Sequence, residues 1–332
     1  MQPTPRMEQA AKDLVRRHLK GRSRLQETNG FLPLECTPKL HRMELIAREV
    51  PLQALSAIPG YRTNGTQRLR NKLYRQVTRI YGKDSIRQIV VLSAPNTGWL
   101  PKSRATIIPR DETGLLYGDL CHILELLPQF KIVLLEIALD FPLASILDTS
   151  FVLQHMLCGK TWLRTGGTEL HQRWGSARSA KIVRAYVKFE ASSFRIELQL
   201  HSRFLRQHGI NHAPDFAKLA TILPQHHIYF AAIDDDKLKK YLQRSRLSHK
   251  TRTEILKTVR KSQKSLWSTL CLLRSKYRFA NVRRLLSPLP GINAVVSAAL
   301  KQWAEQWQKH SSLRGFGTTK EQHSSKLDRT NS

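Results

Sequence analysis

Apolar and polar residues alternate over two neighbouring segments in the middle of the chain. The segments are KIVRAYVKFE, residues 181–190, and FRIELQLH, residues 194–201, with the short stretch ASS between them. Strand side chains point to opposite faces in turn, so the pattern predicts two antiparallel strands with one polar face each. The polar positions are Arg184, Tyr186, Lys188 and Glu190 on the first strand and Arg195, Glu197, Gln199 and His201 on the second.

The segments before this hairpin alternate between strand and helix patterns. Strands are predicted for the apolar runs at residues 87–93 and 131–141, and helices for residues 117–129 and 142–157. Gly166 and Gly167 form a two-residue turn signal between two further short strands. The chain is therefore expected to be an α+β protein, with a central antiparallel β-sheet packed with helices and flanked by basic helical N- and C-terminal regions.

The basic helical pattern near the N-terminus is clearest in TQRLRNKLYRQVTRIYG, residues 66–82. Leu69, Leu73, Val77 and Ile80 recur there at helical spacing, and Arg or Lys fills much of the remainder. We interpret this segment as a basic amphipathic helix on the surface. A helix-turn-helix unit is the alternative interpretation.

The C-terminal third is also basic and periodic. Residues 237–310 contain 18 Lys and Arg against two Glu. Apolar residues at helical spacing predict a core-facing stripe, made by Ile255, Val259, Leu266, Leu270 and Leu273. The surrounding charges indicate DNA contact, with an ordinary solvated face as the alternative.

The charge balance of the whole chain points to a polyanionic partner. The 332 residues contain 55 Lys and Arg against 25 Asp and Glu, a formal net charge of +30. Nucleic acid is the commonest partner of such a surface, because binding releases counterions from the phosphate backbone. A membrane is not expected as a partner, since no apolar run approaches the roughly 20 residues that span a bilayer. The four cysteines are widely spaced and no signal peptide is visible, which favours a reducing, cytoplasmic location.

Two carboxylates lie close together on the strand predicted for residues 131–141. Glu136 and Asp140 share one face there, with only Ala138 between them. Two such acids repel each other unless a cation is near, and a hard divalent ion such as Mg²⁺ or Mn²⁺ would relieve the repulsion. The alternative is a solvated face whose acids pair with the abundant Arg and Lys.

The hairpin adds Tyr186, Lys188 and Glu197 to these two acids if its strands lie in the same sheet. Such a set suits phosphodiester chemistry, in which a metal ion polarises the phosphate, a phenolate attacks phosphorus and cations stabilise the developing charge. The ordinary pKa of tyrosine is about 10, so the phenol would need cationic neighbours to react near neutral pH. Cross-strand ion pairing, with Tyr186 as a packing residue, is the alternative.

Two further signals in the sequence are weaker. The motif CGKT at residues 158–161 resembles the end of a phosphate-binding loop, but Gln154 stands where the motif needs glycine, so ATP binding is not expected. His201 shares a face with Glu197 and could join a metal site, although a lone histidine is more often a surface residue.

The order of these motifs resembles the initiators of rolling-circle replication from plasmids and filamentous phages, the Rep_trans or replication initiation factor family. That family has a strand with paired acids, a G-S-R-like turn followed by serine, then R-x-Y-x-K with a nearby acid, and finally R-x-E-x-x-L. The matching stretches here are LLEIALDF, GSARS, RAYVK and RIELQL, within about residues 85–215. Glu136 replaces the more usual Asp, Ala177 is an extra residue in the turn, and Val187 stands where an acid is common.

The resemblance implies a metal-dependent endonuclease that nicks and rejoins one DNA strand at a replication origin. Tyr186 would be the nucleophile, leaving a 5′-phosphotyrosine and a free 3′-hydroxyl, and Lys188 would assist at the phosphate. The implied metal ligands are Glu136, Asp140 and Glu197, with Mg²⁺ or Mn²⁺ as the ion. The residues expected to contact DNA are Arg173, Arg178, Arg184, Arg195, Arg260, Lys261 and Lys264.

The resemblance suggests partners, and the patterns along the chain suggest a division into regions. The partners would be double- and single-stranded DNA at an origin, a host helicase and polymerase, and a second copy of the chain. The regions would be a basic helical N-terminal region at 1–84, a catalytic α+β nicking domain at 85–235, a basic helical DNA-binding region at 236–310, and a disordered tail at 311–332. A non-catalytic DNA-binding regulator is the main alternative. An RNA-binding sheet is a further alternative, disfavoured because the predicted face carries carboxylates where stacking aromatic residues would be expected.

Overall fold

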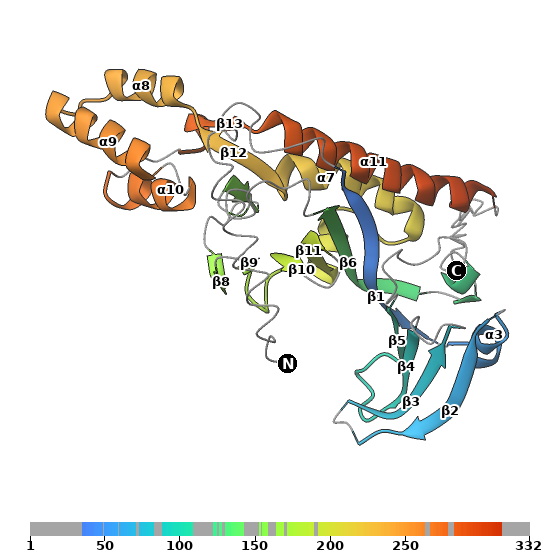
Figure 1. The fold of residues 1–332 in the computed structure, drawn as a ribbon. Helices are drawn as coiled ribbons and strands as arrows, with labels where there is room; N and C mark the ends of the chain where they lie inside the picture. Colours follow the sequence, from blue (N-terminus) through green and yellow to red (C-terminus); the bar gives the residue numbers. More distant parts are fainter. Residues whose placement is uncertain are drawn as a thin grey trace, which may run out of the picture.

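The computed structural model describes most of the chain between residues 35 and 313. The residues within that span that it leaves undescribed are 49, 59, 71–72, 83–87, 109–121, 125, 128–129, 143–152, 154, 159–163, 169–170, 189–191, 263–265 and 278–281. The helices predicted for residues 117–129 and 142–157 lie largely outside the described residues, as do residues 1–34 of the N-terminal region predicted to be helical. What is described is an α+β fold (Figure 1).

The principal feature of the fold is one large antiparallel sheet. Within the described residues it has ten strands in the order β2-β3-β4-β5-β1-β6-β11-β10-β9-β8. Its strands are β1 (Thr37–Ala47), β2 (Arg62–Arg68), β3 (Tyr74–Tyr81), β4 (Gln88–Pro95), β5 (Ser103–Ile108), β6 (Phe130–Pro142), β8 (Arg164–Thr168), β9 (His171–Trp174), β10 (Lys181–Lys188) and β11 (Ser193–His201). The central antiparallel sheet and the α+β class predicted from the alternating pattern are confirmed.

One face of this sheet is apolar and carries the main core. Ile80, Ile89, Ile107, Met43 and Leu135 pair in a row across five strands, and each is at most 1% exposed. Because side chains alternate along a strand, the neighbouring positions form a second, polar face. The two faces of one sheet therefore separate the core from the charged residues.

Helices cover the apolar face. They are α6 (Ser202–Gln207), α7 (Ala217–His226) and the long α11 (Pro290–Leu313), and Figure 1 shows α7 and α11 running side by side along the sheet. Phe216, in the short helix η3 (Ala213–Phe216), stacks on Trp303 of α11 with ring centroids 6.0 Å apart and planes 10° from parallel. Burying such large aromatic side chains fixes α11 against η3. α11 also extends three residues into the tail expected to start at residue 311.

The helix predicted over residues 66–82 is wrong. The segment instead ends β2 and forms β3, and only the short α3 (Leu52–Ser56) is helical between β1 and β2. The residues of β3 are largely β-branched or aromatic, a composition that favours strands over helices. Two of the four apolar residues at helical spacing, Leu69 and Leu73, lie outside the strands, and Leu73 is 42% exposed. Residues 37–81 are thus not a helical region.

The two predicted hairpins have different outcomes. β10 and β11 pair across the short turn as predicted. The prediction that Gly166 and Gly167 form a turn is wrong, because both residues pair with β9 inside β8. β8 is an edge strand, where glycine is tolerated without disrupting a sheet interior.

A second, smaller core lies in the C-terminal third. It joins α8 (Asp235–Arg244), α9 (His249–Ser262) and α10 (Leu266–Ser275) to a small sheet of β7 (Met156–Leu157), β12 (Tyr229–Ile233) and β13 (Leu286–Pro288), next to the short helix η4 (Val282–Leu285). The predicted apolar stripe is confirmed, since Ile255, Val259, Leu266, Leu270 and Leu273 are all at most 2% exposed. No helix among the described residues is long and apolar enough to cross a membrane.

Candidate functional site

The polar face of the central strands brings the predicted hairpin residues beside the paired acids. β6 and β11 pair so that Asp140 lies opposite Arg195, and Glu136 lies opposite Gln199. β11 and β10 pair so that Arg195 lies opposite Tyr186. The three strands are therefore adjacent and in register, as the interpretation of the hairpin required.

His41 of β1 completes a possible metal site that the sequence patterns did not reveal. Its Nδ1 atom lies 3.3 Å from Oε1 of Glu136 and 3.9 Å from Oε1 of Glu197. One ligand atom from each of these three residues lies within 4.8 Å of the other two. The pairing of β1 with β6 shifts register between Leu40 and Arg42, so His41 is the extra residue of a β-bulge. Bulges re-aim a side chain in this way.

The signal that could have identified His41 is the alternation in PKLH, residues 38–41. There the polar Lys39 and His41 flank the apolar Leu40. The bulge itself has no evident sequence signature here.

Asp140 lies on the same face as Glu136 and Glu197. Its carboxylate pairs with two cationic side chains and is not part of the three-residue metal group. Arg195 donates to both of its carboxylate oxygens, Nε to Oδ1 at 2.6 Å and Nη2 to Oδ2 at 2.8 Å. Lys39 Nζ lies 3.1 Å from Oδ2. Burial by itself raises the pKa of Asp140, but the hydrogen bonds and charges of Arg195 and Lys39 outweigh it and hold the pKa below its usual value. The three-residue metal group thus contains His41 where the sequence suggested Asp140.

Glu136 is buried but stays ionised at neutral pH. Burial raises its pKa, while hydrogen bonds from His41 and Gln199 and the nearby charges of His41 and Arg184 lower it by more, so the pKa lies below its usual value. The Gln199 amide nitrogen donates to Oε2 at 3.2 Å. A buried carboxylate held in its charged form is well suited to bind a cation.

Tyr186 donates a short hydrogen bond to Glu197. Its hydroxyl lies 2.5 Å from Oε1 of Glu197, which is 3% exposed. Burial raises the pKa of the Tyr186 phenol, and the hydrogen bond to Glu197 and its negative charge raise it further, which outweighs the opposing effect of Arg195. The pKa therefore lies well above its usual value, opposite to the lowering expected for a reactive phenol. A cation bound to Glu197 would offset its negative charge and so reduce the rise in the pKa of Tyr186.

This pKa can be tested by titrating phenolate absorbance. Because Tyr186 stays protonated where ordinary tyrosines ionise, near pH 10, the wild type and Tyr186→Phe should have the same absorbance up to about pH 11. Glu197→Gln removes the carboxylate charge but not the burial, so the Tyr186 phenol should ionise at a lower pH in this variant than in the wild type. A wild type that exceeds Tyr186→Phe by one phenolate near pH 10 would contradict the structure.

The other predicted site residues are spread more widely. Lys188 is half-buried at the end of β10, opposite Ser193, and Arg184 lies 3.7 Å from Glu197 and opposite Arg173 of β9. Arg178 is exposed in the turn after β9. Arg260 and Lys261 belong to α9, but their side chains are outside the described residues, and so is Lys264. Their roles at DNA stay predictions.

The turn that carries Arg178 depends on a glycine. Gly175 has a φ of +97°, and a Cβ atom there would lie 2.7 Å from the carbonyl oxygen of Lys181. Only glycine fits such a position without displacing backbone. The turn leads directly into β10 and so helps to place Tyr186.

Comparisons with known proteins find a distant likeness among solved structures. No protein-family model matches the chain, and no curated protein matches it. A solved structure of the rolling-circle replication initiator protein from Geobacillus stearothermophilus aligns with a TM-score of 0.40 and 15% sequence identity. The alignment covers 68% of this chain and 96% of that one. A TM-score below 0.5 does not establish a common fold.

Proposed function

We propose that the protein is a plasmid or phage rolling-circle replication initiator that nicks and rejoins one DNA strand at an origin through a phosphotyrosine at Tyr186. The observation that carries the proposal is the 2.5 Å hydrogen bond from Tyr186 to Glu197. Glu197 also belongs to the group that could hold a metal ion, so nucleophile and metal would act at one phosphate. The net charge of +30 supports DNA as the substrate.

The donor atoms of His41, Glu136 and Glu197 fit a divalent metal ion. Two carboxylates and one imidazole can bind Mn²⁺, and with additional water ligands they also suit Mg²⁺. Both acids are 3% exposed, so their charges are costly unless a cation compensates them. When bound, such an ion would polarise a phosphate oxygen and reduce the negative charge beside Tyr186.

The residues of the chain would divide the cutting reaction among them. A bond forms between Tyr186 Oη and phosphorus, the bond from phosphorus to the 3′ oxygen breaks, and the phenolic proton passes to Glu197. The leaving 3′ oxygen takes up a proton from solvent, and Glu197 returns its proton to solvent. Arg184 and Lys188 would contact the non-bridging oxygens. Rejoining is the reverse reaction, in which the 3′-hydroxyl attacks the phosphotyrosine.

The function is tested by incubating the protein with supercoiled plasmid that carries its native origin. We expect nicked circles in Mn²⁺ or Mg²⁺, none with a chelator, and a protein–DNA adduct that survives denaturation. The control is the same plasmid without the origin. Tight binding to the origin with no nicking under any metal condition would instead favour the non-catalytic regulator.

Measuring metal binding to variants distinguishes the ligand set seen in the structure, which includes His41, from the set suggested by the sequence, which includes Asp140. Loss of residues that only support a metal ligand typically weakens binding about 10- to 100-fold, so His41→Ala and Glu136→Gln should weaken Mn²⁺ binding by at least that much. Asp140→Asn should change the affinity by less than about threefold, because Asp140 is outside the three-residue group. Calorimetric titration of each folded variant measures this. A large loss with Asp140→Asn and none with His41→Ala would contradict the assignment.

A further inference from the structure

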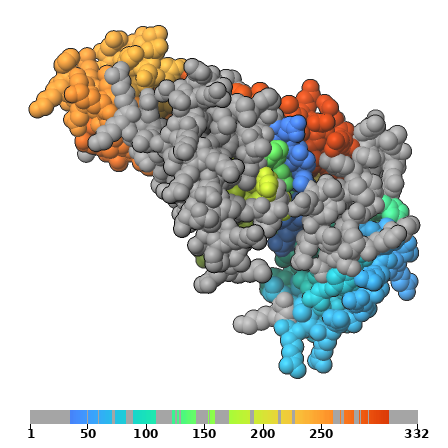
Figure 2. Space-filling model, in the orientation of Figure 1, coloured from blue at the N-terminus to red at the C-terminus, as the bar shows by residue number. Residues whose placement is uncertain are grey.

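The strands β2, β3 and β4 form an arm that the proposed chemistry leaves unexplained. Here the arm means Arg62–Pro95. Figure 1 shows it projecting below the rest of the sheet, and Figure 2 shows the same segments, blue to cyan, at the end of the molecule far from α8–α10. All seven residues of β2 are exposed, and β2 is an edge strand. Residues 62–81 contain six Lys and Arg and no Asp or Glu.

The arginines of β3 lie on the same face of the sheet as the candidate metal site. Arg79 pairs with Val90, Val90 with Thr106, Thr106 with Glu44, and Glu44 with Leu134 of β6. Directly paired residues share a face of the sheet. Leu134 and Glu136 are two positions apart on β6, so they also share that face. Arg75 and Arg79 are four residues apart on β3 and so share that face too.

The sheet between the arm and the site is also positively charged. Arg42 and Arg104 both bind Glu44, which is 3% exposed. Two cations on one acid leave a net positive charge at the middle of the face. The basic face therefore extends from Tyr186 across β1 and β5 to the arm.

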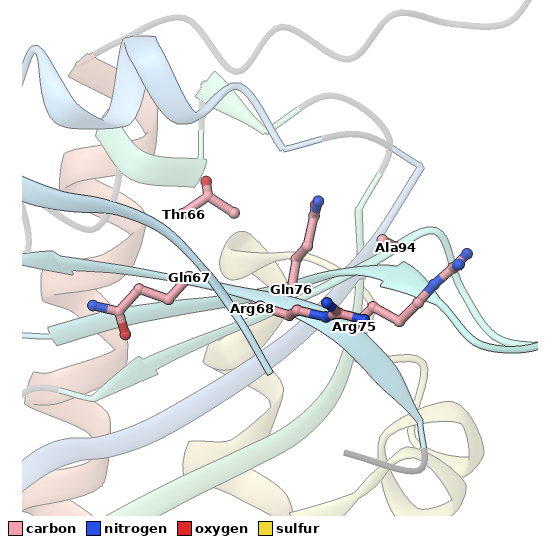
Figure 3. A pocket seen from close by; sticks show the side chains of 6 residues that line it. All are labelled: Thr66, Gln67, Arg68, Arg75, Gln76 and Ala94. Atoms are coloured by element: carbon pink, nitrogen blue, oxygen red, sulfur yellow. The ribbon is translucent and has the colours of Figure 1, made fainter. Parts of the chain in front are cut away.

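The outer end of the arm has the chemistry of a phosphate-binding surface. A hollow of about 440 Å³ is lined there by Thr66, Gln67, Arg68, Arg75, Gln76 and Ala94, the residues drawn in Figure 3. Guanidinium, amide and hydroxyl groups are all donors to phosphate oxygens, and arginine matches them in a bidentate manner. Trp99, in the loop after β4, is 76% exposed and offers a surface for a sugar or base.

We propose that this arm holds duplex DNA next to the cut strand by its phosphate backbone. The inference rests on the proposed function in taking DNA as the ligand. β3 and β10 are six strand positions apart. At about 4.8 Å for each strand, β3 lies about 29 Å from β10 across the sheet. Arg79 is in line with Leu134 of β6, whereas Tyr186 is in line with Asp140, which adds an offset of about 20 Å along the strands. Arg79 is therefore about 35 Å from Tyr186, the length of about ten base pairs. The arm would thus contact the duplex within about one helical turn of the cut.

The test measures DNA binding in a chelator, so that no cutting is involved. Fluorescence anisotropy compares wild type with Arg75→Gln/Arg79→Gln on a 30-base-pair origin duplex. We expect about tenfold weaker binding, and a slope of log affinity against log salt that falls by about 2, because each lost phosphate contact contributes about 0.9. The matched control is Arg203→Gln/Arg206→Gln, which removes two exposed arginines from α6. Unchanged thermal unfolding midpoints show that both variants are folded.

A second comparison tests the position of the arm. With the duplex shortened to about five base pairs on one side of the cut site, the arm variant and wild type should bind equally, whereas shortening the other side should leave their difference intact. Equal losses in the arm and α6 variants, no loss in the arm variant, or the same loss on every duplex length would overturn the proposal. So would an effect seen on single-stranded DNA or duplex RNA but not on duplex DNA.

The outcomes also separate this proposal from the proposed function. If the wild type nicks the origin but Arg75→Gln/Arg79→Gln binds the long duplex as tightly as wild type, only the arm assignment fails. If no protein nicks and the arm variant still loses binding on the long duplex alone, the arm assignment holds without the cutting activity.

Discussion

Tyr186→Phe should abolish the covalent protein–DNA adduct and reduce origin nicking by about 10⁴-fold or more. Removing a nucleophile leaves only the contribution of substrate binding and electrostatics, and losses of that order are typical. The fold should be unaffected, since the change removes one hydroxyl and leaves Glu197 with Arg184 at 3.7 Å and Arg195 at 4.0 Å. The measurement is the rate of conversion of supercoiled plasmid, together with adduct bands on a denaturing gel.

The matched control for this variant is Tyr229→Phe. Tyr229 lies in β12 of the small sheet, away from the polar face of the large one. It should nick and form adduct at the wild-type rate. Origin binding by Tyr186→Phe in a chelator should also match the wild type. Nicking by Tyr186→Phe at the wild-type rate would refute the assignment of the nucleophile.

The second large effect concerns stability. Arg195→Met should destabilise the protein by about 3–5 kcal/mol, because it leaves Asp140 buried without its bidentate partner. Asp140 is 8% exposed and Arg195 is 5% exposed, so little water can replace the lost hydrogen bonds. Urea unfolding at neutral pH, followed by circular dichroism, measures the change.

A double variant shows whether the ion pair itself accounts for this loss. Replacing both partners, Asp140→Leu with Arg195→Met, should recover most of the stability, because two apolar side chains of similar volume need no solvation. Lys39, which is 3.1 Å from Asp140, remains near the surface and can reach water. A double variant as unstable as Arg195→Met would show that Arg195 stabilises the sheet by packing.

The same ion pair predicts a loss of stability in acid. The pKa of Asp140 is lower in the folded protein than its usual value, so the carboxylate contributes stability above its unfolded pKa, near 4. That contribution is lost as the pH falls through the lower folded pKa. In Arg195→Met the loss of stability in acid should be smaller, because the residue that lowers the pKa of Asp140 most is gone.

Much of the central site could be predicted because its signals are local. The strand backbone itself sets an alternation with a period of two. The polar faces of β10 and β11 and the shared face of the two acids of β6 could therefore be predicted from the sequence. The short ASS stretch between two strands favoured a hairpin and therefore the approach of Tyr186 to Glu197. The apolar stripe of α9 and α10 was readable for the same reason, from a period of 3.6.

The errors arose where local patterns were ambiguous. In residues 66–82, apolar residues at helical spacing overlap with the β-branched and aromatic residues of β3, which favour a strand, and pairing with β2 and β4 decided between the two. Two consecutive glycines are typical of turns, yet Gly166 and Gly167 lie in the edge strand β8. In both places tertiary pairing outweighed a local preference worth only about 1 kcal/mol.

The α+β class, the strands with one polar and one apolar face, the tyrosine beside an acid and the basic character of the chain all follow from the amino-acid sequence alone. These follow from side-chain alternation and charge, which a strand or helix expresses wherever it lies. Which acids share a site depends instead on how distant strands pair. A bulge in β1 places His41 beside Glu136 and Glu197. The register of β6 with β11 places Asp140 opposite Arg195, with which it forms an ion pair. Register and bulges depend on contacts between strands distant in sequence, and no local pattern encodes them.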